Sequence, residues 1–203
     1  MVAKTKTFTF NGIEAIPIDV QVKITSGNPS FSIVGLPDKS VGESKERVRG
    51  AITSTGLSWP FEKITVNLAP ADLQKEGGHF DLAIALGIMV EIGAIPQHFL
   101  DKYFIMGELS LDGSVNAVGG IISSAISANQ FNCGLICPKA NGKEAMWAGD
   151  IDIIATADIL SLINHLKGYQ IIARPENFNN FENKKYPDFI DVKGQEIAKR
   201  ALE

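Results

Sequence analysis

Two glycine pairs constrain the fold of this 203-residue chain most strongly, because each stands directly before a run of helix-compatible residues. Gly77 and Gly78 lie in the segment 75–81, and the apolar run 82–90 follows them. Gly119 and Gly120 precede a second run, which continues to residue 129. Glycine tolerates backbone torsions that other residues avoid, so it suits a turn that leads into a helix. The sequence therefore predicts two helices that are each entered through a glycine turn.

The rest of the chain alternates between strand-like and helix-like patterns. In residues 14–24 every second residue from 16 onwards is apolar, so these side chains lie on one face, which is typical of a half-buried strand. Helices interleaved with strands predict an α/β (α+β) fold in which helices pack on a mixed sheet. We expect further strands at 31–34, 63–67, 103–111, 135–137 and 151–155, and helices at 39–55, 80–92, 120–129, 140–147 and 158–167.

Composition limits the classes of function. The formal net charge of −4 gives the chain no overall basic signature for nucleic acid. The apolar run 82–90 is too short to span a bilayer, so no membrane association is expected. Residues 1–10 contain lysines but lack the apolar core of a secretory signal. We therefore expect a cytoplasmic protein.

The metal-binding residue types are few and scattered. Cys133 and Cys137 have a C-x3-C spacing that fits neither a redox motif nor half of a zinc site, and reduced thiols are favoured over a disulfide. His79, His98 and His165 fall on three different predicted elements. No metal site is therefore predicted.

A change in composition near residue 174 indicates the domain organisation. Residues 1–173 form the predicted domain, and 174–187, rich in Asn, Phe, Lys, Glu and Pro, form a linker. Residues 188–203 follow this linker. The chain has no G-x-x-x-x-G-K-[ST] phosphate loop, since its one Gly142–Lys143 pair is followed by Glu144.

A set of segments spread along residues 5–203 carries a family resemblance. Together they resemble the N-terminal region of the YifB/ComM family of magnesium-chelatase-like AAA+ proteins. The end of the chain, 188–203, resembles the start of the AAA+ ATPase module, cut before its motor. The segments that carry the match are 31–38, 43–49, 66–72, 75–81, 107–113 and 188–202.

The resemblance implies a Lon-protease-like, ribosomal protein S5 domain 2-like fold ahead of an AAA+ motor. It also implies that the full-length protein is a hexamer that uses ATP and Mg. As a DNA helicase on single-stranded or branched DNA, it would promote branch migration in natural transformation. Val192, Gly194 and Gln195 would then lie beside the adenine. Without the phosphate loop, we expect no cofactor and no measurable ATP binding in the present chain.

The Lon resemblance also locates an erased catalytic dyad. His79 stands at the position of the Lon serine, and Ile122 stands at the position of the lysine. An alkyl group can neither accept nor donate a proton, and an imidazole is no substitute for an alkoxide nucleophile. No catalytic residue is therefore predicted. His79 has two readings. One is a polar contact to a peptide, a phosphate or a neighbouring subunit. The favoured reading is that His79 or Gly78 caps the following helix, while Asp81 in its first turn complements the positive end of the helix dipole.

Three basic residues on the predicted helix 39–55 are candidates for contact with DNA or with a neighbouring subunit. Lys45, Arg47 and Arg49 could neutralise phosphates. The competing reading is a solvated face, in which Glu43 and Arg47 form an i,i+4 pair.

The leading hypothesis is a non-catalytic Lon-like domain that organises the ring or guides a DNA strand towards its pore. Two alternatives remain open at this point. One is an ATP-dependent protease with a relocated nucleophile. The other is a scaffold that binds only proteins, which the pI of about 5.4 favours over direct DNA contact.

Overall fold

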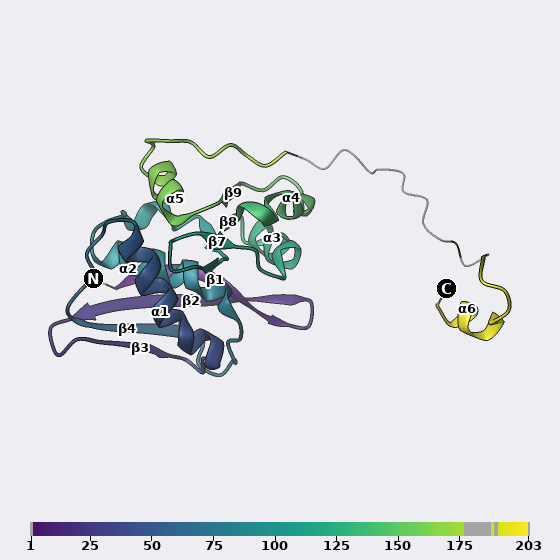
Figure 1. Cartoon of the computed structure of the whole chain (residues 1–203), viewed down its shortest axis with the longest axis horizontal. Coiled ribbons are helices and arrows are strands. Elements are labelled where there is room, and N and C mark those ends of the chain that lie inside the picture. The colour runs from purple at the N-terminus through teal and green to yellow at the C-terminus, as the bar shows by residue number, and fades with distance from the viewer. Residues whose placement is uncertain (1, 177–187, 189–190, 203) are drawn as a thin grey trace.

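The computed structural model describes residues 2–176, 188 and 191–202, and it confirms the predicted α/β fold (Figure 1). Seven strands form one mixed sheet in the order β3-β4-β2-β1-β5-β8-β9, and β6 and β7 form a separate ribbon. The strands are β1 (Ala3–Asn11), β2 (Glu14–Thr25), β3 (Ser30–Val34), β4 (Lys63–Ala69), β5 (Tyr103–Ile105), β6 (Glu108–Leu109), β7 (Val115–Asn116), β8 (Gly134–Pro138) and β9 (Ile153–Thr156). The α-helices are α1 (Lys39–Ser54), α2 (Asp81–Glu91), α3 (Ile121–Gln130), α4 (Gly142–Ala145), α5 (Ile159–Leu166) and α6 (Glu196–Leu202).

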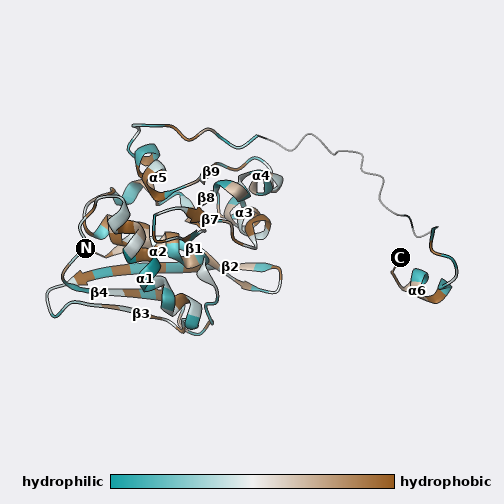
Figure 2. Cartoon of the chain, in the orientation of Figure 1, coloured by the Kyte–Doolittle hydropathy of each residue, from teal (hydrophilic) through white to brown (hydrophobic). Residues whose placement is uncertain are grey.

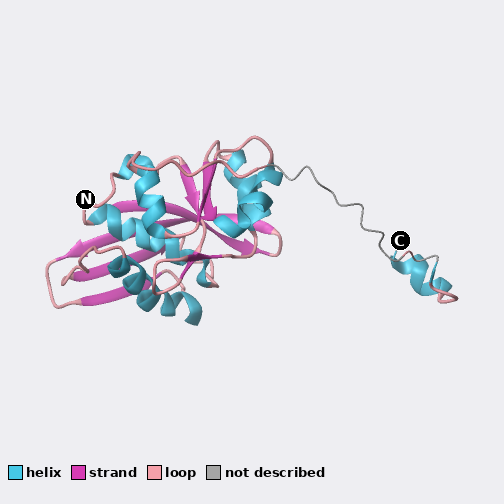
Figure 3. Cartoon of the chain, turned by 45° about the horizontal axis from the view of Figure 1, so that its top comes forward, coloured by secondary structure: helices cyan, strands magenta, loops and turns pink. Residues whose placement is uncertain are grey.

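The sheet combines an antiparallel centre with parallel flanks. β1 and β2 form a hairpin that closes at the pair Asn11 and Glu14, and β4 pairs antiparallel with β2. The pairs β3–β4, β1–β5, β5–β8 and β8–β9 are parallel. Each parallel pair needs a crossover connection, and α1 and α3 supply two of them. Helices therefore flank the sheet (Figure 3).

Two hydrophobic clusters fill the space between the sheet and the helices. Ile18, Val20 and Val22 of β2 are fully buried in the larger cluster, which includes α1, α2 and α5. Phe8 and Phe104 belong to the second cluster, with α3 and α4. Helix α2 is apolar nearly all round, as Figure 2 shows, because both the sheet and α1 cover it. The predicted central position of this helix is confirmed.

One predicted strand is wrong in its extent. The segment 103–111 is not continuous, because β5 ends at Ile105 and β6 begins at Glu108. Between them, Gly107 leaves the sheet: its N–H donates to the His79 carbonyl at 3.1 Å, and its carbonyl accepts from Leu82 N–H at 3.0 Å. The chain is therefore diverted to the start of α2. The predicted helix 140–147 is likewise divided, since α4 covers only four residues between two 3-10 turns.

Candidate functional site

Five of the segments that carry the family resemblance, 31–38, 43–49, 66–72, 75–81 and 107–113, meet around the start of α2. Lys75 N–H donates to the Leu36 carbonyl at 3.1 Å, and Asp38 N–H donates to the Lys75 carbonyl at 2.9 Å. A β-carbon added to Gly78 would lie 2.3 Å from a carboxylate oxygen of Glu108, so the two segments touch. Residues that are distant in sequence are thus joined at one place by backbone contacts.

A buried ion pair connects α1 with α2 at this place. The Asp81 side chain is fully buried, and Arg47 reaches it with Nε at 2.6 Å and Nη2 at 3.1 Å. Asp81 also accepts from the Ser44 hydroxyl and, at 3.2 Å, from Leu109 N–H. The hydrogen bond to Asp81 raises the pKa of Arg47. The Asp81 carboxylate therefore joins α1, α2 and β6. The predicted Glu43–Arg47 pair is wrong, because Arg47 binds Asp81 and Glu43 pairs with Lys39 at 3.8 Å.

His79 is held inside the domain. Its Nε2 lies 2.8 Å from the Phe8 carbonyl, and only 8% of the residue is exposed. Its ring packs against Phe80 and Phe10, with centroids 4.3 and 5.5 Å apart. A carbonyl can only accept, so Nε2 carries the proton in this bond. The favoured reading, in which His79 or Gly78 caps the helix, is wrong, because Phe80 is the N-cap of α2 and makes no side-chain cap bond. Asp81 does lie in the first turn of α2, as predicted.

Burial gives His79 a pH-dependent contribution to stability. It lowers the pKa of the imidazole below its ordinary value of 6.5, so the folded state keeps the ring neutral where the unfolded chain already takes up a proton. This contribution is complete above pH 6.5 and is lost as the pH falls below that value. Between pH 7.5 and pH 5.5, the free energy of unfolding of wild type should fall more steeply than that of His79→Gln. The two slopes should differ by no more than about 1.4 kcal/mol per pH unit, the limit for a single proton. Parallel slopes in urea unfolding would contradict this.

The second dyad position has no polar group. Ile122 lies in the first turn of α3 and is 37% exposed. The glycine turn before it is confirmed, because Gly120 has a φ of 79° and faces the Phe10 ring, whose Cζ a β-carbon would approach to 2.3 Å. Gly77 at the other turn has a φ of 93°. The two turns are retained while the dyad positions carry an imidazole and an alkyl group.

The hydroxyls and the amine near this place have other partners. Ser44 donates to Asp81, and Ser124 donates to the Gly120 carbonyl at 2.9 Å. Lys75 is fully buried, and its ammonium donates to the carbonyls of Pro70 and of Leu73, the latter at 2.6 Å. Burial lowers the pKa of Lys75. Lys75 therefore closes the loop 70–75, a role that sequence reasoning missed because it is set by carbonyls rather than by a motif.

Comparison with known proteins agrees with this arrangement. Residues 20–141, more than half of the chain, match the protein family described as subunit ChlI of Mg-chelatase. The chain belongs to this family.

Two relatives show which members of the ChlI family the chain resembles. It is 36% identical over 196 residues to the competence protein ComM of Haemophilus influenzae and 38% identical over 192 residues to the uncharacterized protein YifB of Escherichia coli K12. These matches cover 94% and 95% of the chain but 38% of each relative. The predicted membership of the YifB/ComM group is confirmed, and the chain spans 38% of the length of each of these two relatives.

The three basic residues predicted to contact DNA or a neighbouring subunit, Lys45, Arg47 and Arg49, have different surroundings in the structure. Arg47 is bound to Asp81, as described above. Arg49 is exposed and Lys45 is half-buried, and within the described residues neither forms an ion pair. Lys45 and Arg49 are therefore the two members of the group whose charges are available to a partner.

The residues expected beside an adenine lie in the loop before α6. Val192 is 42% exposed. Gly194 and Gln195 have positive φ values of 75° and 58°, and the Gln195 carbonyl accepts from Lys199 N–H at 3.0 Å. Of the predicted linker 174–187, Arg174 contacts the body through the Ile151 carbonyl at 3.0 Å, and residues 177–187 lie outside the described residues.

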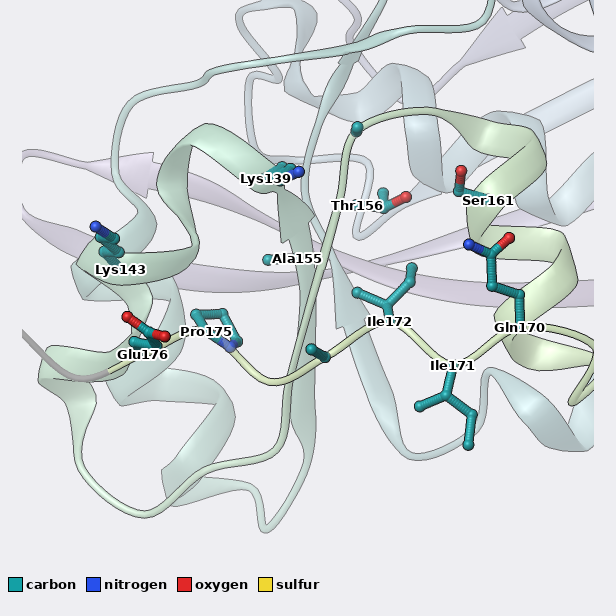
Figure 4. A pocket seen from close by; sticks show the side chains of 12 residues that line it. Lys139, Lys143, Ala155, Thr156, Ser161, Gln170, Ile171, Ile172, Pro175 and Glu176 are labelled. Atoms are coloured by element: carbon teal, nitrogen blue, oxygen red, sulfur yellow. The ribbon is translucent and has the colours of Figure 1, made fainter.

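A cavity of about 420 Å³ lies away from the dyad positions (Figure 4). Lys139 and Lys143 stand on one side of it, and Ser161 and Gln170 stand on the other. The Ser161 hydroxyl donates to the Asp158 carboxylate at 2.8 Å. This cavity was not predicted, because no sequence pattern links the end of the sheet with the segment 170–176, and the two enclose the cavity only in the folded chain. Its lining includes Lys139, Lys143, Ala155, Thr156, Ile172 and Pro175.

The described residues contain neither a metal-binding cluster nor a membrane-spanning helix. Among residues 2–176, 188 and 191–202, no group of three or more His, Cys, Asp or Glu side chains is placed so that it could hold a metal ion. No helix in the same part of the chain is both long and apolar enough to cross a membrane.

Proposed function

We propose that this chain is the non-proteolytic N-terminal domain of a ComM-type AAA+ ATPase that moves single-stranded or branched DNA. Membership of the ChlI family and the similarity to ComM support the proposal. The chain spans 38% of the length of ComM and of YifB, so the ATPase, with its ATP and Mg, belongs to the remaining part of the protein. Its setting is the cytoplasm, and its assembly is a hexameric ring.

The observation that carries the non-proteolytic role is the pair His79 and Ile122. The imidazole is buried and bonded to the Phe8 carbonyl, and the alkyl group cannot act as a base. Around them the two glycine turns are formed, and the Arg47–Asp81 ion pair joins α1 to α2. A scaffold kept without its dyad serves to hold the ring together or to guide a strand towards the motor.

The full-length protein tests this proposal on a forked DNA substrate. We expect ATP-dependent branch migration, together with no labelling by a serine-reactive fluorophosphonate and no degradation of an unfolded protein. His79→Ser with Ile122→Lys is the informative companion variant, because it returns both dyad groups to the scaffold. The proposed function would be refuted if wild type were labelled by the fluorophosphonate or degraded the unfolded protein. It would also be refuted if the rate of ATP hydrolysis were the same with and without DNA.

A second candidate function is a scaffold that touches only protein. It is favoured by the net charge of −4 and by the internal use of Arg47. Lys45→Glu with Arg49→Glu separates the two candidates when DNA binding is compared at protein concentrations at which light scattering shows the variant and wild type to be equally assembled. Direct DNA contact predicts weaker binding by the full-length protein and a salt slope that is flatter by up to about two. Lys102→Glu with Lys167→Glu is the matched control, since both lysines are exposed elsewhere. Equal binding by the two double variants would support the protein-only scaffold.

A further inference from the structure

The end of β3 exposes two large apolar side chains. Val34, the last residue of this edge strand, is 45% exposed, and Leu36 is 56% exposed. A residue that projects from a sheet edge is available to a partner, and edge strands are commonly covered in the assembled protein. The turn at Leu36 is therefore a candidate contact surface.

The backbone fixes Leu36 in an outward position. Its φ of 55° lies in the left-handed region, which costs a leucine roughly 1–2 kcal/mol. The cost is tolerated because the neighbouring chain determines the turn: Lys75 N–H binds the Leu36 carbonyl, and Asp38 N–H binds the Lys75 carbonyl. The side chain is thus presented by a rigid support rather than by a loose loop.

The surroundings of Leu36 are acidic. Asp38, Asp72 and Glu76 lie on the two segments that meet at the Pro37–Lys75 bridge. The Lys75 ammonium is turned inward to the carbonyls of the loop 70–75 and forms no ion pair with them among the described residues. Asp38 is half-buried, and its carboxylate accepts from Val41 N–H at 2.7 Å and from Gly77 N–H at 3.4 Å, so the exposed charges are those of Asp72 and Glu76. We define the acidic turn as Val34, Leu36, Asp72 and Glu76.

The opposite charge lies on another part of the same domain. Lys45 and Arg49, four residues apart on α1, form what we define as the basic flank. With a rise of 1.5 Å per residue, they lie about 9 and 15 Å along the axis from the first residue of the helix. Neither has an ion pair within the described residues. Glu43 and Glu46 are exposed on the same helix, but Lys45 and Arg49 give it two positive charges, unpaired among the described residues, that complement the acidic turn.

We propose that the acidic turn of one copy docks on the basic flank of a second copy, with Leu36 as the apolar anchor. The partner is another copy because the domain itself supplies the complementary charge, and the carboxylates repel phosphate, which excludes nucleic acid from the acidic turn. In a ring, each copy gives its acidic turn to one neighbour and receives the acidic turn of the other, so the interface is heterologous. The inference rests on the proposed ring and names the surfaces that build it.

Charge reversal in the full-length protein tests the docking. Asp72→Lys with Glu76→Lys, and separately Lys45→Glu with Arg49→Glu, are each expected to weaken assembly at least about tenfold, because like charges then face each other. The quadruple variant restores opposite charges and should assemble within about threefold of wild type. Light scattering and native mass spectrometry across a concentration series measure this. Lys102→Glu with Lys167→Glu is the charge control and should assemble normally. Absence of rescue in the quadruple variant overturns the proposal.

Leu36→Asn tests the anchor without disturbing the fold. Asparagine adopts the left-handed conformation more readily than leucine, so the melting temperature should stay level or rise while assembly weakens about tenfold. A benzophenone side chain at position 36, in a mixture of light and heavy isotope-labelled protein, should cross-link to a peptide of the other copy that contains Lys45 or Arg49. Cross-links to DNA, or only within one copy, overturn the proposal.

The outcomes separate this inference from the proposed function. If wild type forms a ring and none of the variants changes it, the docking is refuted while the motor role stands. If wild type neither assembles nor migrates branches with ATP, both are refuted. Assembly that depends on Leu36 together with loss of branch migration in the same variant supports both.

Discussion

Replacing Arg47 with alanine is expected to lower the free energy of unfolding by about 3–5 kcal/mol. The reason is the position of Asp81, whose side chain is fully buried and would lose both guanidinium bonds. The remaining donors, the Ser44 hydroxyl and Leu109 N–H, do not compensate a buried charge. The loss should be measured by urea unfolding of the domain, with far-UV circular dichroism to confirm the fold of each variant.

A double-mutant cycle tests whether the pair acts as a unit. Arg47→Ala and Asp81→Ala should each be severe, and the double variant should be less unstable than their sum by about 0.5–3 kcal/mol, because removing both partners leaves no unpaired charge. Lys39→Ala is the matched control, since Lys39 pairs with Glu43 at 3.8 Å on the exposed face of the same helix. Such a surface pair contributes roughly 0.3–0.5 kcal/mol. A loss at Arg47 no larger than this control would contradict the structural role.

The sequence predicted those elements whose pattern is local. Helix 39–55 and the observed α1 (Lys39–Ser54) agree within one residue, and the alternation in 14–24 is the alternation of β2. The strand β1 (Ala3–Asn11) was not predicted, although its Thr and Phe residues are typical of strands. Three of its threonines are buried: Thr5 donates to the Ala83 carbonyl, Thr7 to the Met106 sulfur and Thr9 to the Gln74 carbonyl. Partners so distant in sequence are invisible to a local pattern.

In the candidate site, too, the sequence located the residues but not their partners in space. The resemblance located His79 and Ile122, but only the structure reveals that His79 bonds to Phe8. Lys45, Arg47 and Arg49 looked equivalent in the sequence. Successive helix residues turn by about 100°, so alternate positions face different directions, and only Arg47 meets the buried Asp81. Charge identity could be predicted, whereas the partner that uses the charge could not.

Replacing Gly35 with alanine is expected to destabilise the domain by about 2–5 kcal/mol, from left-handed strain and overpacking together. Gly35 has a φ of 104°, and a β-carbon there would lie 2.1 Å from the Leu68 carbonyl oxygen. That oxygen belongs to strand β4, so the clash cannot be relieved by a rotamer change. The backbone would have to move where β3 ends, which also displaces Leu36. Thermal and urea unfolding of the domain measure the loss.

Gly42→Ala is the control for this prediction, because Gly42 lies inside α1 and a β-carbon there would meet nothing within 4 Å. Alanine in a helix interior is favoured over glycine by about 1 kcal/mol, so this variant should be more stable than wild type. The two substitutions add the same methyl group to the same residue type, and their opposite signs isolate backbone geometry as the cause. If Gly35→Ala unfolded at the wild-type urea concentration, the turn would have to be free to change its conformation. Leu36 would then lack the rigid support on which the docking of two copies depends.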